Sequence, residues 1–396
     1  MSAADFPIAR ALLRSWHHPT SLLVGEIERT HVTKPGAKLR PFCANRGFQG
    51  APHGSAPQSL RLTGWRLAHA VVKGDFLNPQ PCPWIHAAGF VLGVATTLDW
   101  RQAELRLCAG ASRSRADFAG TSLAGRIGQG VALLVMDLRG YAYDAHYPRA
   151  PGKQGPDFIV QNGATGALVE AKGRFVAPGQ SPEIKKALND GLKQLAACNA
   201  PGVTKSFVVA TFLREVGDGC PEPSLVALVD PDIGDAESDD SPDRVIRENY
   251  AGWLRAMGLD SIASDLRART RRERRGPVVM WKRRVAGAEF LLIPVPWPIP
   301  PIGQTQLWPW KCYLQKNARY VVLGLARKIV DRLQHALQNP SSALGDFRST
   351  DQEGEPVSGP IEDDGFYGSV LRDGSLMGII RGDSLFKKEC YEEIEL

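Results

Sequence analysis

Residues 155–175 read GPDFIVQNGATGALVEAKGRF, in which two short apolar runs are separated by glycines. The runs FIV and ALVEA predict two strands, and the glycines between them predict a hairpin. Because side chains at positions i and i+2 of a strand point to the same side, Glu170 and Lys172 share one face. The hairpin would bring Asp157 beside them. The segment therefore predicts two carboxylates and a lysine at one place.

These three residue types suggest a chemistry. Two carboxylates with open water positions suit a hard divalent cation such as Mg²⁺, which Mn²⁺ could replace. An ion held there would polarise a phosphodiester and lower the pKa of a bound water, with a cationic lysine alongside. This is nuclease chemistry. The alternative is a surface hairpin whose charges are merely solvated.

The flanking segments predict a defined order of elements. Apolar residues recur at helical spacing over residues 121–138, and a second helix is expected over 181–198, opened by Ser181-Pro182. Residues 141–147 alternate as a strand does, and the apolar runs 206–213 and 224–230 predict two further strands. With the hairpin, the order is helix, three strands, helix and two strands.

At these residues the chain resembles the PD-(D/E)xK nuclease superfamily, the restriction-endonuclease-like enzymes. Pro156-Asp157 matches the first half of the family signature and Glu170-Ala171-Lys172 the second. The resemblance covers roughly residues 120–230, with the αβββαβ order of the family core. It implies that Asp157 and Glu170 bind the metal, that the Ala171 carbonyl could complete its shell, and that Lys172 orients or activates the attacking water.

The first predicted helix departs from the family pattern. Many members carry an acidic residue there that points toward the metal, whereas this chain has Gln129 at the matching place and no Asp or Glu from 121 to 136. An amide can hydrogen-bond a metal-bound water but adds no charge. Gln129 could therefore mark a weaker metal site, a single metal or a degenerate enzyme, and the alternative is an ordinary helix-surface glutamine.

The second predicted helix supplies further candidates. In several branches of the family this helix presents a glutamine or lysine to the scissile phosphate, and Gln194 is the best candidate here. Lys185 and Lys193 on the same helix, and Arg174 just beyond the strand that carries Lys172, are candidate phosphate contacts. The alternative for the lysines is a solvated helix face.

A basic cluster follows the predicted core. Residues 231–243 form an acidic linker, and a helix predicted over 244–271 leads into cations that could contact a nucleic-acid backbone. We call the cations of residues 267–284 the basic cluster: Arg267, Arg269, Arg271, Arg272, Arg274, Arg275, Lys282, Arg283 and Arg284. The alternative is an exposed, highly charged helix end. Further on, we predict a helix over 317–337 and a hairpin over 365–380 that turns at Asp373-Gly374.

Composition bounds the remaining possibilities. The chain has 396 residues, 43% apolar and 23% charged, which is typical of a globular protein of two to three domains. Its seven scattered cysteines predict a reducing compartment, with neither a zinc site nor a disulfide framework. No leader is evident and no apolar run approaches the ~18 residues of a membrane span, so we expect a cytoplasmic protein without a membrane partner.

The expected architecture is an α/β protein with a restriction-endonuclease-like αβββαβ core, in which helices flank a mixed sheet. The core would span residues 116–230, preceded by an α+β accessory domain (1–115) and followed, after the linker, by a basic, partly helical α+β region (244–396). The expected function is Mg²⁺-dependent hydrolysis of phosphodiesters, with DNA favoured over RNA, and defence against foreign DNA fits by analogy of fold. Self-association or a defence partner protein stays open. The alternative is a degenerate nucleic-acid-binding or assembly subunit that keeps the fold.

Overall fold

A computed structural model describes most of the chain. The described residues are 16–34, 40–41, 48–49, 58–77, 91, 93–114, 118–147, 155–162, 165–196, 198, 203–220, 224–230, 242–269, 276–295, 319–344, 359–363, 365–381 and 391–396. They belong to two compact units, one of His18–Asn249 and one of Tyr250–Leu396 with Met1–His17. Each unit contains one large sheet, so the chain is a mixed α/β protein.

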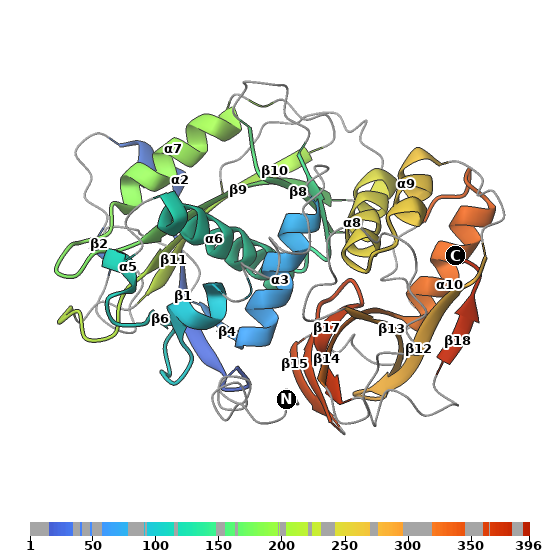
Figure 1. Cartoon of the computed structure of the whole chain (residues 1–396). Coiled ribbons are helices and arrows are strands. Elements are labelled where there is room, and N and C mark those ends of the chain that lie inside the picture. Colours follow the sequence, from blue (N-terminus) through green and yellow to red (C-terminus); the bar gives the residue numbers. More distant parts are fainter. Residues whose placement is uncertain are drawn as a thin grey trace. The chain divides into compact units, whose positions relative to one another are not determined.

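The unit of His18–Asn249 is built on a seven-stranded mixed sheet (Figure 1). Its strands, in spatial order, are β4 (Gln58–Leu62), β1 (Thr20–Glu26), β11 (Leu225–Val229), β10 (Val203–Leu213), β9 (Thr165–Phe175), β8 (Phe158–Asn162) and β7 (Tyr143–His146). Strands β9 and β10 run parallel, as do β1 and β11, and the other neighbours are antiparallel. The parallel pair β9–β10 requires a crossover, which the helix between the two strands supplies.

Helices cover both faces of this sheet. They are α2 (Arg29–Thr33), α3 (Gly64–Leu77), the short α5 (Ala111–Ser114), α6 (Phe118–Leu138) and α7 (Ile184–Ala196). Helix α6 touches the backbone of β9, since a Cβ on Gly128 would lie 2.7 Å from the Cα of Gly173. Helix α7 lies so close to β10 that a Cβ on Gly191 would collide with Val208. Figure 1 shows α6 and α3 on one side of the sheet and α7 on the other.

The predicted order of elements from residue 118 to 229 is confirmed. Helix α6, strands β7, β8 and β9, helix α7, and strands β10 and β11 follow one another as expected, with ends that differ by a few residues. Glycines explain part of the layer spacing. At Gly128 and Gly173 the missing side chains let a helix backbone approach a strand backbone, which larger residues would prevent.

The structure divides the chain differently from the sequence-based expectation of an accessory domain ending at residue 115. Strand β1 pairs in parallel with β11 and antiparallel with β4, so both join the central sheet. Residues 98–107 add a small two-stranded sheet, β5 (Leu98–Asp99) and β6 (Arg106–Leu107), and β2 (Arg40–Pro41) pairs with β3 (Phe48–Gln49). Of the expected linker 231–243, residues 231–241 lie outside the described residues, and the last two begin helix α8 (Pro242–Ala256).

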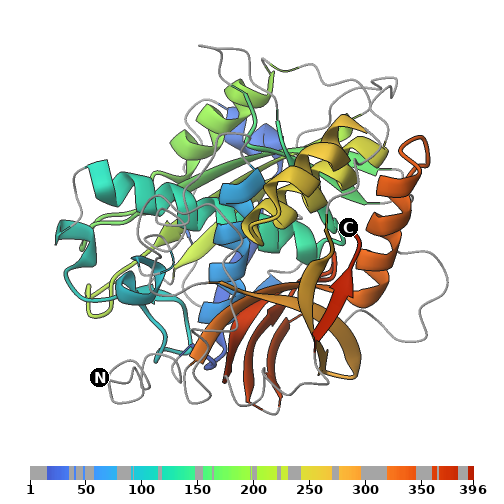
Figure 2. The same cartoon turned by 45° about the vertical axis from the view of Figure 1, so that its right-hand side comes forward.

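The unit of Tyr250–Leu396 contains a second seven-stranded sheet, and this one is entirely antiparallel (Figure 2). Its spatial order is β15 (Gly359–Asp363), β16 (Phe366–Val370), β17 (Ser375–Arg381), β14 (Arg319–Ala326), β13 (Ala288–Val295), β12 (Val278–Val285) and β18 (Tyr391–Ile394). Helices α9 (Asp260–Ala268) and α10 (Arg327–Gln338) belong to it. The hairpin predicted at Asp373-Gly374 is confirmed, and Gly374 adopts the left-handed φ of +78° that such a turn requires.

Two predicted helices of this part of the chain are wrong in extent. The helix expected over 244–271 is two helices, α8 and α9, because Gly258 takes a φ of +80° and ends the first one. The helix expected over 317–337 begins only at Arg327, and Arg319–Ala326 is strand β14. Among the described residues, no helix combines the length and apolarity needed to cross a bilayer.

Candidate functional site

The hairpin of β8 and β9 brings Asp157 beside the segment of Glu170. The strands pair with Phe158 opposite Val169, and just beyond this pair the Asp157 amide donates to the Val169 carbonyl oxygen at 3.0 Å. The Ala171 amide in turn donates to Oδ2 of Asp157 at 2.9 Å. The Asp157 carboxylate is therefore held against the β9 backbone between the two residues that the sequence singled out.

Glu170 and Lys172 form an ion pair on one face of β9. Their Oε1 and Nζ atoms are 2.5 Å apart, and their side chains are 3% and 16% exposed. Lys172 Nζ also donates to Oε1 of Gln194, which helix α7 supplies. A carboxylate this deeply buried needs a cation or several donors to stay charged, and Lys172 is such a cation. The structure thus joins Gln194 to the predicted pair.

Gln129 contacts Asp157 from helix α6, which lies on the face of the sheet opposite α7 (Figure 1). Its Nε2 donates to Oδ1 of Asp157 at 3.3 Å, so the two carboxylate oxygens of Asp157 accept from an amide side chain and from a strand N–H. The close approach of Gly128 to Gly173 sets α6 at this distance from the strand. Gln129 is a half-buried neighbour of Asp157, which argues against its being an ordinary surface glutamine.

Two residues near the site were missed by the sequence analysis. Arg126 donates from Nη1 to Oε1 of Gln129 at 3.3 Å and forms an ion pair with Asp75 of helix α3. The Asp75 side chain is 1% exposed and that of Arg126 is 31% exposed. The sequence does indicate that Asp75 has a partner, because a charged residue inside the apolar run of residues 64–77 needs one when it is buried. Nothing in the spacing indicates that the partner lies on another helix.

The other predicted residues lie outside this hydrogen-bonded group. Arg174 is exposed and its Nη1 bonds the Gly173 carbonyl oxygen at 3.1 Å. Lys185 Nζ bonds the Lys34 carbonyl oxygen at 2.5 Å, and Lys193 is exposed on α7. Arg271, Arg272, Arg274 and Arg275 lie outside the described residues.

A divalent cation is compatible with the donors present. Asp157 and Glu170 offer two carboxylates, and the described part of the chain contains no group of three or more His, Cys, Asp or Glu residues suited to a metal. Mg²⁺ is commonly held by one or two carboxylates, with waters and substrate phosphates completing its shell. The pair therefore fits such an ion and does not fit a site made only of protein ligands, such as structural zinc.

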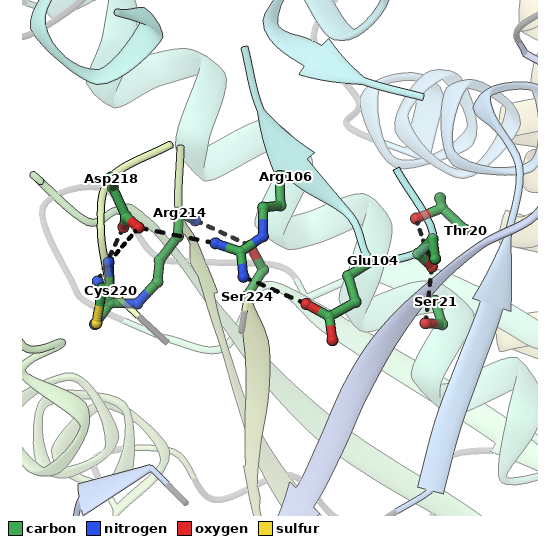
Figure 3. Close-up of polar contacts among 9 residues, drawn as sticks. Thr20, Ser21, Glu104, Arg106, Arg214, Asp218, Cys220 and Ser224 are labelled. Carbon is green, nitrogen blue, oxygen red and sulfur yellow. Dashed lines mark hydrogen bonds and ion pairs between the residues drawn. The ribbon is translucent and has the colours of Figure 1, made fainter. Parts of the chain in front are cut away.

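A second group of buried charges lies where β10 ends and is structural (Figure 3). Arg214 and Asp218 are both 1% exposed, with Nη1 and Oδ2 3.2 Å apart. Arg214 also donates from Nη2 to the Gln180 carbonyl oxygen and from its backbone N–H to Oγ of Ser224. Arg106 lies 3.9 Å from Asp218 and 3.4 Å from Glu104. These contacts join the loops that follow β9 and β10. The Arg214 guanidinium already donates to Asp218 and to the Gln180 carbonyl, which is a structural role.

Comparison of the chain with models of protein families, with curated proteins and with solved structures returned no match. What the site does must therefore be inferred from its own residues and their geometry.

Proposed function

We propose that this protein is a metal-dependent nuclease that hydrolyses phosphodiester bonds of DNA, built on a restriction-endonuclease-like αβββαβ core. The observation that carries the proposal is the clustering of Asp157, Glu170 and Lys172 on one hairpin, with Gln194 bonded to the lysine. The order of α6, β7, β8, β9, α7 and β10 supports it, because Asp157 directly precedes the second strand and Glu170 and Lys172 lie on the third, close to the family pattern.

Asp157 and Glu170 would hold the ion through their carboxylates. When bound, a divalent cation supplies Lewis-acid polarisation of the scissile phosphate and lowers the pKa of a neighbouring water. The protein contributes the orientation of the ligands. The Ala171 N–H and the Gln129 amide fix the two oxygens of Asp157, so that this carboxylate needs little rearrangement to bind.

Lys172 supplies a fixed positive charge. An ammonium has three donors, and two of them are directed at Glu170 and Gln194. The third can donate to the attacking water or to a phosphate oxygen. Because this cation is held beside Glu170 by two partners, it would stabilise negative charge as it develops, without reorganisation. Gln194 acts by positioning Lys172.

One observation favours a second candidate, a nucleic-acid-binding or assembly subunit that has lost catalysis. Helix α6 contributes the neutral Gln129 where many members of the family carry an acidic residue, so the proposed ligands are the two carboxylates of Asp157 and Glu170. A site with one charge fewer would bind a divalent cation more weakly. On this view the protein would bind DNA without cleaving it.

Incubation of the purified protein with linear DNA, circular DNA and RNA, each with Mg²⁺, Mn²⁺ or EDTA, tests the proposal. We expect cleavage of DNA that needs the metal and is lost in Asp157→Ala and Lys172→Ala. Glu183→Ala is the matched control, because Glu183-Ile184-Lys185 repeats the acidic-x-Lys pattern at the start of α7 and the Glu183 side chain is 75% exposed. Binding without cleavage under all conditions would select the second candidate, and equal cleavage by wild type and the two site variants would overturn the site.

A further inference from the structure

Helices α3 and α6 pack antiparallel with a charged pair toward each end of their contact. At one end, Nη2 of Arg66 lies 2.8 Å from Oδ2 of Asp137, and at the other Arg126 pairs with Asp75. Between the two pairs the helices approach closely, since a Cβ on Gly130 would lie 2.7 Å from a methyl group of Val71. Two similar ion pairs thus join the same helices, and only one of them adjoins the candidate site.

The Asp75 end of this contact connects to a proposed metal ligand through two further hydrogen bonds. Arg126 bonds Oε1 of Gln129, and Nε2 of Gln129 bonds Oδ1 of Asp157, each at 3.3 Å. A guanidinium can only donate, so the amide atom that it contacts must be the oxygen. The amide N–H groups of Gln129 must then face Asp157. The orientation of Gln129 is therefore set by Arg126.

We propose that Asp75 and Arg126 are positioning residues, which orient Gln129 and through it the Asp157 carboxylate for metal binding. The inference rests on the proposed function and assigns a role to residues outside the family signature. Asp75 holds the guanidinium from a buried position, and Nη1 of Arg126 contacts both Asp75 and Gln129. Partners behind a metal ligand act in this way by fixing the ligand's orientation.

The same contacts give a reason for glutamine at position 129. A glutamate there would set its carboxylate against that of Asp157, where the Gln129 amide now donates a hydrogen bond. A neutral amide accepts from Arg126 and donates to Asp157, which a glutamate, acceptor on both oxygens, cannot do. On this view Gln129 has a positioning role between Arg126 and Asp157. Its presence then does not indicate that the protein has lost catalytic activity.

Calorimetric titration with Mn²⁺ tests the inference without reference to catalysis. Asp75→Asn should weaken Mn²⁺ binding by about 10-fold or more, as loss of a partner behind a metal ligand typically does. Asp137→Asn is the matched control, because it makes the same change in the other ion pair of the same helices. It lies eight residues from Gln129, about 12 Å along α6. We expect the control to keep wild-type affinity within twofold.

A double-mutant cycle separates positioning from a general loss of charge or stability. If Asp75 acts through Gln129, Asp75→Asn should weaken Mn²⁺ binding no further when Gln129 is already alanine. Arg126→Lys retains the charge, but its ammonium ends one bond short of the position of Nη1, so it should reproduce the loss. It serves also if Asp75→Asn does not fold.

The outcomes are distinct. Wild-type affinity in Asp75→Asn and Arg126→Lys would overturn the inference alone, as would equal losses in Asp137→Asn or an undiminished loss in the Gln129→Ala background. Absence of Mn²⁺ binding by the wild-type protein, or binding that survives Asp157→Ala, would overturn the proposed function and this inference with it.

Discussion

Replacing Lys172 by methionine should destabilise the protein in the absence of metal and should do so less when metal is present. Methionine has nearly the length of lysine but no charge, so the change removes the ammonium and leaves little cavity. The ammonium contacts Glu170, whose side chain is 3% exposed. Removing one partner of a buried ion pair typically costs about 3–5 kcal/mol, because the remaining charge is left in a poorly solvated position. The 16% exposure of Lys172 places the expected cost at the lower end of this range.

The magnitude can be converted into a melting temperature. For domains of about 150–250 residues, 1 kcal/mol corresponds to roughly 2–4 °C, so the variant should melt about 6–12 °C below wild type in EDTA. Excess Mn²⁺ should recover much of this difference, since a cation at Asp157 and Glu170 replaces the missing positive charge. The double variant Glu170→Gln/Lys172→Met should melt closer to wild type in EDTA than Lys172→Met does, because it buries no unpaired charge.

Thermal unfolding followed by circular dichroism, in EDTA and in Mn²⁺, measures all of these quantities. Gln194→Leu is a useful companion, because it removes the other acceptor of Lys172 without changing charge. Equal melting temperatures for Lys172→Met and wild type in EDTA would refute the buried pair. A metal-independent deficit in Lys172→Met would refute the placement of a cation beside Glu170.

Three further predictions concern other residues. Gln129→Glu should melt lower than wild type in EDTA, because it sets a second carboxylate against Asp157 where the amide now donates, and an unchanged melting temperature would mean that residue 129 does not contact Asp157. Hydrogen bonds from the Arg101 side chain hold the pKa of Asp99 at about 2. The stability that Asp99 provides should therefore be complete above its ordinary pKa near 4 and be lost as pH falls toward 2. Urea unfolding of Asp99→Asn across this range should show a difference from wild type that shrinks with falling pH, and a constant difference would contradict the assignment. Alanine at four arginines of the basic cluster should weaken DNA binding for all sequences alike. The salt dependence of binding, measured by fluorescence anisotropy in Ca²⁺, should also become flatter. The log–log slope should change by roughly 0.9 for each phosphate that the variant no longer neutralises. The four residues are Arg271, Arg272, Arg274 and Arg275, and an unaltered slope would mean that they do not contact DNA.

Sequence patterns predicted the elements whose formation depends on residues close together in the chain. The hairpin that carries Asp157 and Glu170 is set by two apolar runs separated by glycines, and its register follows from that local geometry. Helix α6 could likewise be predicted from apolar spacing alone. Local periodicity failed where it was ambiguous. Val321, Val322 and Leu325 fit a helical stripe, yet they lie on β14, where the consecutive residues Val322 and Leu323 are both fully buried.

Contacts between distant parts of the chain were beyond such patterns. Strand β1 joins the central sheet by pairing with β11, about 200 residues later, and no local signal specifies that partner. The pairing of Asp75 with Arg126 is similar, because the local sequence around neither residue indicates a partner on another helix. Sequence therefore indicated the proposed ligands on the hairpin and left out Asp75 and Arg126, which contact Gln129 or its partner.

Single-turnover cleavage of a labelled DNA duplex by wild type and Glu170→Gln, with Mg²⁺ and with EDTA, tests the central claim most directly. Glutamine keeps the size of the side chain and an acceptor for Lys172, and removes the charge that a divalent cation needs. Loss of one stabilising group at a reacting centre costs about 2.7–4 kcal/mol elsewhere, so the variant should cleave at least about 100-fold more slowly, and wild type should be inactive in EDTA. Equal rates for the two proteins, or cleavage that persists in EDTA, would contradict a metal-dependent site at Asp157, Glu170 and Lys172.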